Sequence, residues 1–316
     1  MKIMANGILL TVINELSLET DQTGCFDESG KAMDCQNTGQ DGAVKKVRRM
    51  EGPERFGVTN DIVQDNLTGL VWHINANLPE FPLTWKEAFE FIQEINDSRL
   101  SGINAWRLPA RKELFSLLSH QFVNPSLPEG HPFINVFHGY YWTRTESARL
   151  LNQAWYVHLG GGKVYRGMKH GSYMVWPVSG RFTGRSFMEN RFIANGDSVY
   201  DRGTRRYWYV GDKMNDGAIP WKEAIRAVEK LNETRQAGHD SWRLPNIREL
   251  ESLVDDCNHS PAFADGFFID TVKDGYWSST TSLYEPRYAW VLYPLDGAIG
   301  VGYKPNADFY VLAVRG

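Results

Sequence analysis

Two arginine–glutamate pairs with identical spacing are the first candidates for ion-pair chemistry. Arg107 precedes Glu113 by six residues, and Arg243 precedes Glu249 by the same interval. Each arginine stands between Trp and Leu, and a buried guanidinium in such surroundings needs a carboxylate or several carbonyl groups as partners. We therefore predict two buried structural clamps, which include the preceding Trp106 and Trp242.

Nucleophilic and metal chemistry find less support. Cys257 follows Asp255-Asp256, and two adjacent carboxylates disfavour the thiolate that would attack a substrate. The eight histidines are scattered, and no Cys-x-x-Cys or His-x-x-x-His pair occurs. We expect no catalytic residue, no metal site and no cofactor.

The amino-terminal segment carries a possible disulfide bond. Cys25 and Cys35 lie ten residues apart in a Gly- and Asp-rich loop, and they can pair if the compartment is oxidising. Residues 1–13 contain one Lys and a short, interrupted apolar stretch, which makes a poor secretory signal and favours a short edge strand. The cytoplasm therefore stays open as a location.

Composition excludes two classes of partner. The net charge of −4 provides no electrostatic footprint for nucleic acid. No apolar run reaches the roughly 18 residues of a membrane span, so we expect no membrane insertion. The sequence says nothing about the oligomeric state.

The two clamps belong to a segment that occurs twice. Residues 106–118 and 242–254 are identical at eight of 13 positions, and Trp72 and Trp208 keep the same offset of 136 residues. A period this long indicates a duplicated domain, because solenoid repeats are roughly 20–50 residues long. We place the lead-in at 1–57, the first repeat at 58–182 and the second at 183–316, with the junction near 180–190.

Each repeat is expected to have an α+β fold with two helices and a small antiparallel sheet. Thr84 and Glu87 form a capping-box pattern ahead of the first helix. The second helices are expected to start at Pro109 and Pro245, and alternating segments close each repeat as strands. The inward face of the first helix is expected to comprise Trp85, Ala88, Phe89, Ile92 and Ile95, matched by Trp221, Ala224, Ile225, Val228 and Leu231.

The combined motifs resemble the Lcl C-terminal domain family, a bacterial family named after a collagen-like adhesin. The resemblance rests on the segment 65–72, on Thr-Trp-Lys-Glu-Ala at 84–88, on the two Trp-Arg-Leu-Pro segments and on the closing Val-Arg-Gly. It covers both repeats, from about residue 58 to the last residue. It implies a tandem of C-type-lectin-like folds, related to the formylglycine-generating enzyme fold, without catalytic residues to transfer.

The resemblance also implies a function. It suggests adhesion or another form of non-enzymatic ligand binding at a bacterial surface, with glycans or proteins as partners, and thus an extracellular, cell-surface or periplasmic location. Glu285-Pro286-Arg287 resembles the calcium triplet of sugar-binding C-type lectins, but its arginine leaves a poor oxygen cage. Calcium is accordingly the less favoured alternative.

In a lectin-like fold, recognition belongs to the loops between the closing strands. The two repeats diverge there, and tyrosine, arginine and asparagine can stack on and hydrogen-bond to sugars or protein surfaces. We favour the second-repeat loops. The candidate ligand-binding residues are Tyr284, Glu285, Arg287, Tyr288, Tyr303, Lys304 and Asn306, with Arg144, Arg149, Arg166 and His170 in the first repeat.

Three alternatives stay open. A receptor-binding protein diversified by a retroelement would vary the loops within residues 276–308. A structural or assembly subunit would have its loops ordered by another chain. An enzyme would depend on Cys257.

Overall fold

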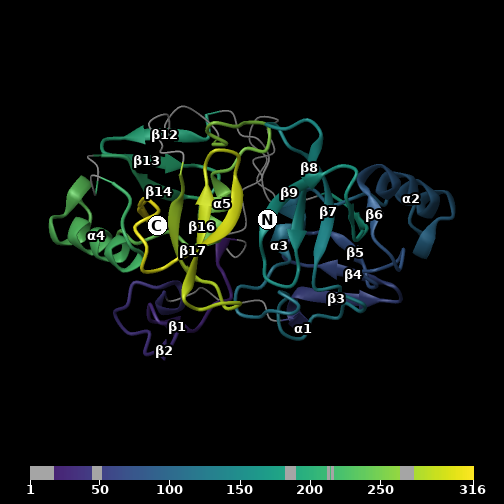
Figure 1. The fold of residues 1–316 in the computed structure, drawn as a ribbon, viewed down its shortest axis with the longest axis horizontal. Coiled ribbons are helices and arrows are strands. Elements are labelled where there is room, and N and C mark those ends of the chain that lie inside the picture. Colours follow the sequence, from purple (N-terminus) through teal and green to yellow (C-terminus); the bar gives the residue numbers. More distant parts are fainter. Residues whose placement is uncertain (1–17, 45–51, 182–189, 212–213, 215–216, 264–273) are drawn as a thin grey trace, which may run out of the picture.

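The computed structural model describes residues 18–44, 52–181, 190–211, 214, 217–263 and 274–316. The expected edge strand at residues 1–13 and most of the junction at 180–190 lie outside these residues. The two repeats lie side by side as mixed α/β units (Figure 1). Among the described residues, no helix is long and apolar enough to cross a bilayer.

The first repeat contains the two predicted helices and three groups of strands. Helix α1 precedes it, and strands β5, β4 and β3 form an antiparallel sheet with β11 at its other edge. The element bounds are α1 Gly52–Arg55, β3 Phe56–Thr59, β4 Ile62–Asp65, β5 Val71–His73, β6 Leu83–Thr84, α2 Trp85–Asp97, α3 Arg111–Ser116, β7 Tyr140–Glu146, β8 Gln153–His158, β9 Val164–Met168, β10 Ser172–Tyr173 and β11 Val178–Ser179.

The second repeat reproduces this order. Its four-stranded sheet has the order β12-β13-β14-β18, which corresponds strand for strand to β3-β4-β5-β11. The bounds are β12 Phe192–Asn195, β13 Ser198–Asp201, β14 Arg206–Tyr209, α4 Trp221–Glu233, α5 Ile247–Ser252, β15 Tyr276–Thr281, β16 Tyr288–Tyr293, β17 Ala298–Tyr303 and β18 Val314–Arg315.

The matching tryptophans occupy matching environments, which confirms the duplication. The indole N–H of Trp106 donates to Leu100 O at 3.0 Å, and that of Trp242 donates to Gln236 O at 3.2 Å. Both rings are buried. The duplicated unit also extends upstream to Arg55, whose bidentate pair with Asp65 recurs as Arg191 with Asp201.

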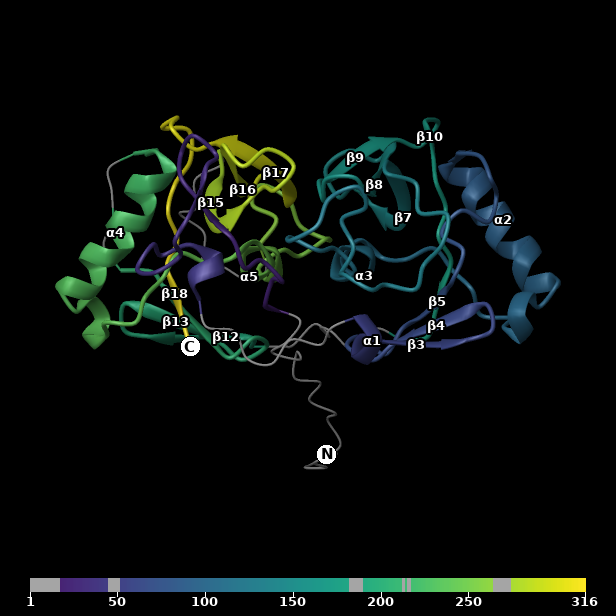
Figure 2. The ribbon, with the colours of Figure 1, turned by 90° about the horizontal axis from the view of Figure 1, so that it is seen from below.

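The closing strands form one sheet instead of two separate ones. Strands β7, β8 and β9 join β17, β16 and β15 in a six-stranded antiparallel sheet, in which Val164 pairs with Ile299. Figure 2 shows α2 and α4 at the outer edges and α3 and α5 facing the middle. The main hydrophobic core likewise runs through both repeats, with smaller clusters under α2 and α4.

Two details of the helices differ from the expectation. Helix α3 starts at Arg111 and α5 at Ile247, two residues after the prolines, and the glutamates of the clamps accept hydrogen bonds from the backbone N–H groups of Ala110 and Asn246. Phe89 does not point inward with Ala88, Ile92 and Ile95 but is exposed at the surface.

The lead-in packs on the second repeat, although it precedes the first. It comprises β1 Cys25–Phe26, β2 Ala32–Met33 and a short 3-10 helix at Asp41–Ala43. The side chain of Gln22 exchanges hydrogen bonds with the backbone of Thr281 in β15, at 2.8 and 2.9 Å. The lead-in is therefore an added layer of the second repeat, and it also binds residues 119–121 of the first repeat.

Candidate ligand-binding site

The contact between the repeats has approximate two-fold symmetry. Val164 and Ile299 hold equivalent positions in β9 and β17 and pair with each other. Lys112 donates to Val254 O, and its counterpart Arg248 donates to Leu118 O, the counterpart of Val254. Because equivalent residues make reciprocal contacts, the repeats are joined as the subunits of a two-fold dimer would be.

One half of this contact, around Trp155, is filled by charged side chains. Arg111 is fully buried; its Cζ atom lies 4.5 Å from the Trp155 ring centroid, and its guanidinium binds Asp256 Oδ1 at 2.7 Å and Gly297 O. Arg166 pairs with Asp296, and Arg149 approaches that carboxylate to 4.0 Å. The predicted ligand residues Arg149 and Arg166 therefore bind the other repeat.

The other half, around Trp290, contains a cavity of about 330 Å³. Three substitutions between equivalent positions explain the difference, because Ile247, Val301 and Gly161 stand where the Trp155 half has Arg111, Arg166 and Asp296. The cavity is lined by Tyr140, His158, Gly161, Lys163, Ser282, Tyr284, Glu285, Tyr288, Trp290 and Val301.

A tight turn of the first repeat borders the Trp290 ring. Gly162 has φ +82°, and a Cβ atom added there would lie 3.2 Å from the ring. The left-handed backbone and the close approach both favour glycine at this position. The turn therefore packs directly against the aromatic ring, while Gly161 beside it contributes no side chain to the cavity.

Tyr140 and His158 supply the first repeat's side of the cavity. Their ring centroids lie 4.8 Å apart, and His158 Nδ1 accepts the Gly161 N–H at 3.0 Å. Burial lowers the pKa of His158, and the nearby Lys163 cation lowers it further. The imidazole is therefore neutral near pH 7, with Nε2 carrying the proton.

Three predicted residues of the second repeat reach the same cavity. Tyr284, with 63% of its surface exposed, Glu285 and Tyr288 contribute to its wall. Arg287 is not among the lining residues but binds both oxygens of Glu285, which is, at 3.0 and 3.1 Å. The hydrogen bond from Arg287, with its charge, lowers the pKa of Glu285. A hard cation would have to displace this guanidinium from the carboxylate.

The remaining candidates lie elsewhere. Tyr303 packs against Tyr288 with the two ring planes tilted by 50° and the centroids 5.3 Å apart, whereas Lys304 is buried beneath the lead-in. Burial lowers the pKa of Lys304 to about 7, and the charges of Asp27 and Glu28 oppose that shift. Asn306, Arg144 and His170 are exposed. These five residues are not among those that line the cavity.

Both clamps form as predicted, but their arginines are less buried than expected. Arg107 binds Glu113 at 2.6 and 2.8 Å, and Arg243 binds Glu249 at 2.6 and 2.5 Å. The arginine side chains remain 26% and 22% exposed, whereas both glutamates are buried. Burial alone would raise the pKa of Glu249, but the Arg243 and Arg206 cations hold it below its ordinary value.

The cysteines take structural positions. Cys25 and Cys35 are joined by a disulfide bond, and Cys257 is exposed. Asp255 accepts the Cys257 N–H at 2.9 Å, and Asp256 forms an ion pair with Arg111 of the first repeat. Both carboxylates beside the thiol therefore make structural contacts. Within the described part of the chain, no group of three or more His, Cys, Asp or Glu residues could hold a metal ion.

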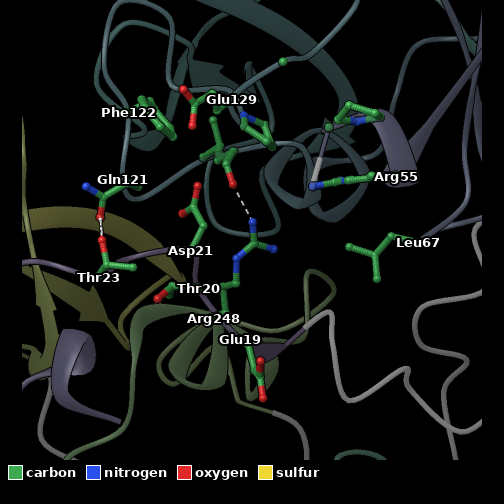
Figure 3. A pocket seen from close by; sticks show the side chains of 15 residues that line it. Glu19, Thr20, Asp21, Thr23, Arg55, Leu67, Gln121, Phe122, Glu129 and Arg248 are labelled. Carbon is green, nitrogen blue, oxygen red and sulfur yellow. Dashed lines mark hydrogen bonds between the residues drawn. The ribbon is translucent and has the colours of Figure 1, made fainter. Parts of the chain in front are cut away.

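A larger cavity, of about 530 Å³, lies between the repeats and the lead-in (Figure 3). Three of its charged groups, Arg55, Asp21 and Arg248, are held by the chain itself. Arg55 binds Asp65, Asp21 accepts the Ser119 O–H and the His120 N–H, and Arg248 binds Leu118 O. Burial and the Arg55 cation lower the pKa of Arg248 to about 10, which leaves it charged at neutral pH. We assign these groups to the assembly of the repeats.

Tyr140, His158 and Trp290 were not among the predicted ligand residues. Each lies in a segment that the sequence marks as a closing strand, and the signal for a site was only their aromatic character. Their importance depends on the antiparallel contact of β9 with β17, which brings β8 of one repeat close to β16 of the other.

These features define a tandem-repeat protein of two mixed α/β domains that share one sheet and one main core. The chain belongs to the Lcl C-terminal domain family, whose model matches residues 61–179 and again residues 197–315. No curated protein matches its sequence.

Proposed function

We propose that the protein is a non-enzymatic binding protein and that the cavity beside Trp290 takes a sugar unit of a glycan. One observation carries the proposal: aromatic rings and polar side chains from both repeats line a single open cavity. Its volume of about 330 Å³ lies within the roughly 300–1,000 Å³ of small-molecule sites. Sugars suit such sites because their C–H faces pack on aromatic rings while their hydroxyl groups pair with polar atoms.

The polar groups of the cavity offer both hydrogen-bond donors and acceptors. Lys163 donates, the neutral His158 presents its Nε2–H, and Glu285 accepts. An uncharged polyhydroxylated ligand can use both kinds of group without burying an unpaired charge. This chemistry favours a neutral sugar over an apolar molecule.

The proposal includes a C-type-lectin-like fold for each repeat and a cell-surface or periplasmic location. A C-type-lectin-like fold would place ligand contacts on the loops between closing strands, and residues 284–288 form such a loop between β15 and β16. The disulfide bond between Cys25 and Cys35 is favoured in an oxidising compartment, which fits a cell-surface or periplasmic protein.

The test is a glycan array on the intact protein, followed by titration of a binding glycan. We expect the double variant Tyr284→Ala with Arg287→Ala to weaken binding at least tenfold, because it removes the exposed ring and the group that orients Glu285. Tyr165→Ala is the matched control, since Tyr165 is exposed on β9 outside the cavity. Undiminished binding by the double variant would refute the assignment.

A further inference from the structure

The two repeats have a corresponding face that is covered in one and bare in the other. The covered face of the second repeat comprises Trp221, Ile225, Thr280, Pro286 and Lys304, and the lead-in packs on it. The bare face of the first repeat comprises the equivalent residues Trp85, Phe89, Thr145, Leu151 and Lys169. In Figure 2 the lead-in runs beside α4 and β15, and no described segment takes that position beside α2.

The lead-in binds the covered face through a few defined contacts. Lys304 Nζ donates to two consecutive carbonyl groups, Phe26 O at 3.1 Å and Asp27 O at 3.4 Å. The Thr280 hydroxyl donates to the buried carboxylate of Asp41 at 2.7 Å. Gly39 lies so close to Ile225 that an added Cβ atom would be 2.6 Å from its Cγ2 atom.

The bare face keeps the same polar chemistry. Lys169 Nζ lies 4.4 Å from the Trp85 ring centroid, as Lys304 Nζ lies 4.2 Å from that of Trp221. Thr145 Oγ1 accepts the Arg111 N–H at 3.0 Å, as Thr280 accepts the Ile247 N–H at 3.1 Å. The Thr145 hydroxyl can therefore donate its hydrogen as Thr280 does.

Large apolar side chains stand exposed on the bare face. Phe89 is 41% exposed, whereas Ile225 beneath Gly39 is 8% exposed. Leu151 is 82% exposed at the position of Pro286, which packs near Gly30 of the lead-in. These two apolar side chains are exposed at positions that the lead-in covers in the second repeat, which marks the bare face as an interaction site.

We propose that the bare face docks a loop of a partner protein with the chemistry of the lead-in. That loop presents consecutive backbone carbonyl groups to Lys169, a carboxylate to Thr145 and a small residue to Phe89. The Glu146 carboxylate that now pairs with Lys169 is largely exposed, so carbonyl groups can replace it at little cost. The lead-in itself is acidic, with Asp27, Glu28, Asp34 and Asp41, and a loop of this charge complements the Lys169 cation of the bare face.

The occupant differs from the lead-in at one point. Asn246 holds Leu18 O at 3.0 Å on the second repeat, and Ala110 stands at the equivalent position of the first. The partner loop therefore needs no carbonyl group there. Its fit depends on the contacts with Lys169, Thr145 and the two exposed apolar residues.

The test uses a disulfide-closed peptide of residues 18–44, fluorescently labelled and titrated into the full-length protein. We expect saturable binding at one site, weakened at least tenfold by Phe89→Glu, by Leu151→Glu and by Lys169→Glu. Phe137→Glu is the matched control, because Phe137 is exposed near the opposite end of β7. Phe89 and Leu151 are exposed, so unfolding temperatures close to wild type are expected for both variants.

Three outcomes would overturn the proposal. One is the absence of saturable binding. A second is binding that all three substitutions leave unchanged, because the peptide would then exchange with the resident lead-in on the covered face. The third is self-association of the full chain that Phe89→Glu abolishes while the peptide fails to bind, which would assign the face to a second copy.

Discussion

The halves of the repeat contact around Trp155 and Trp290 are two versions of one arrangement. The Trp155 half buries Arg111 and Arg166 against Asp256 and Asp296, whereas the Trp290 half leaves a cavity at the equivalent place. The backbones correspond, so the difference lies in which side chains fill the space. A duplicated fold can thus keep one half as a structural joint and free the other for a ligand.

The largest effect is expected in the charged half. Arg111→Met removes a fully buried cation and strands Asp256 and Gly297 O, which should lower the free energy of unfolding by about 3–5 kcal/mol. Ile247→Met is the matched control at the equivalent position and should cost less than about 1.5 kcal/mol. Urea unfolding measures both, and equal effects would contradict the distinction between the halves.

The two arginine–glutamate clamps are present in both repeats, so their substitution provides a comparison for the halves that differ. Arg107→Ala and Arg243→Ala should each cost about 2 kcal/mol, between the values for exposed and buried pairs, since both arginines keep some solvent contact. The loss should be smaller at Arg243, because Arg206 still lies 3.2 Å from Glu249. Chemical unfolding of both variants provides the comparison.

Because the pKa of Glu249 is lowered in the folded protein, the stability that the Arg243–Glu249 clamp contributes depends on pH. As the pH falls below about 4.5, the unfolded chain binds a proton at this site more readily than the folded chain does. The stabilisation is therefore present above that pH and is lost as the pH falls through the folded pKa. A Glu249→Gln variant should lose this part of the acid dependence, and an unchanged profile would count against it.

The lead-in packs beside the Trp290 half of the repeat contact. Removing its disulfide bond should therefore destabilise that half more than the Trp155 half. Asp21 of the lead-in holds Ser119 and His120, and the His120 ring lies 6.0 Å from that of Trp290. Replacing Cys25 and Cys35 by Ser should lower stability by about 2–3 kcal/mol for so short a loop. Hydrogen exchange should quicken in β15 more than in β7, and uniform quickening would contradict the one-sided support.

Filling the cavity with charged side chains should make the Trp290 half of the repeat contact resemble the Trp155 half. Val301→Arg places a guanidinium where Arg166 stands in the other half, and binding of the sugar found on the array should weaken at least tenfold. Adding Gly161→Asp recreates the partner of that guanidinium and should recover stability without recovering binding. Titration and thermal unfolding test both variants, and retained affinity in Val301→Arg would place the ligand elsewhere.

The smallest effect concerns pH at His158. Its pKa is lowered by burial and by Lys163, so the unfolded state takes up a proton first as the pH falls below about 6.5. Stability should therefore decrease as the pH falls through that range, and protonation of Nδ1 also breaks the bond from Gly161. His158→Gln should flatten both the stability and the binding profile between pH 7 and pH 5, measured by thermal unfolding and titration.

Features encoded over short distances were predictable from the sequence. The duplication, the arginine–glutamate clamps six residues apart, the capping box at Thr84 and the two helices of each repeat all follow from local spacing. The Cys25–Cys35 bond is confirmed for the same reason, because its partners lie within one loop. Phe89 was misassigned because a helical stripe shows which residues share a face, but not how far the neighbouring chain covers it.

The sequence by itself determined that one domain occurs twice and which residues hold each copy together, since those contacts recur at a constant spacing. Only the tertiary structure decided how the copies meet. The pairing of Val164 with Ile299, the ion pair of Arg111 with Asp256 and the cavity beside Trp290 join residues more than 100 positions apart. The physical reason is that complementary shape and charge between two folded surfaces arise only after each copy has folded.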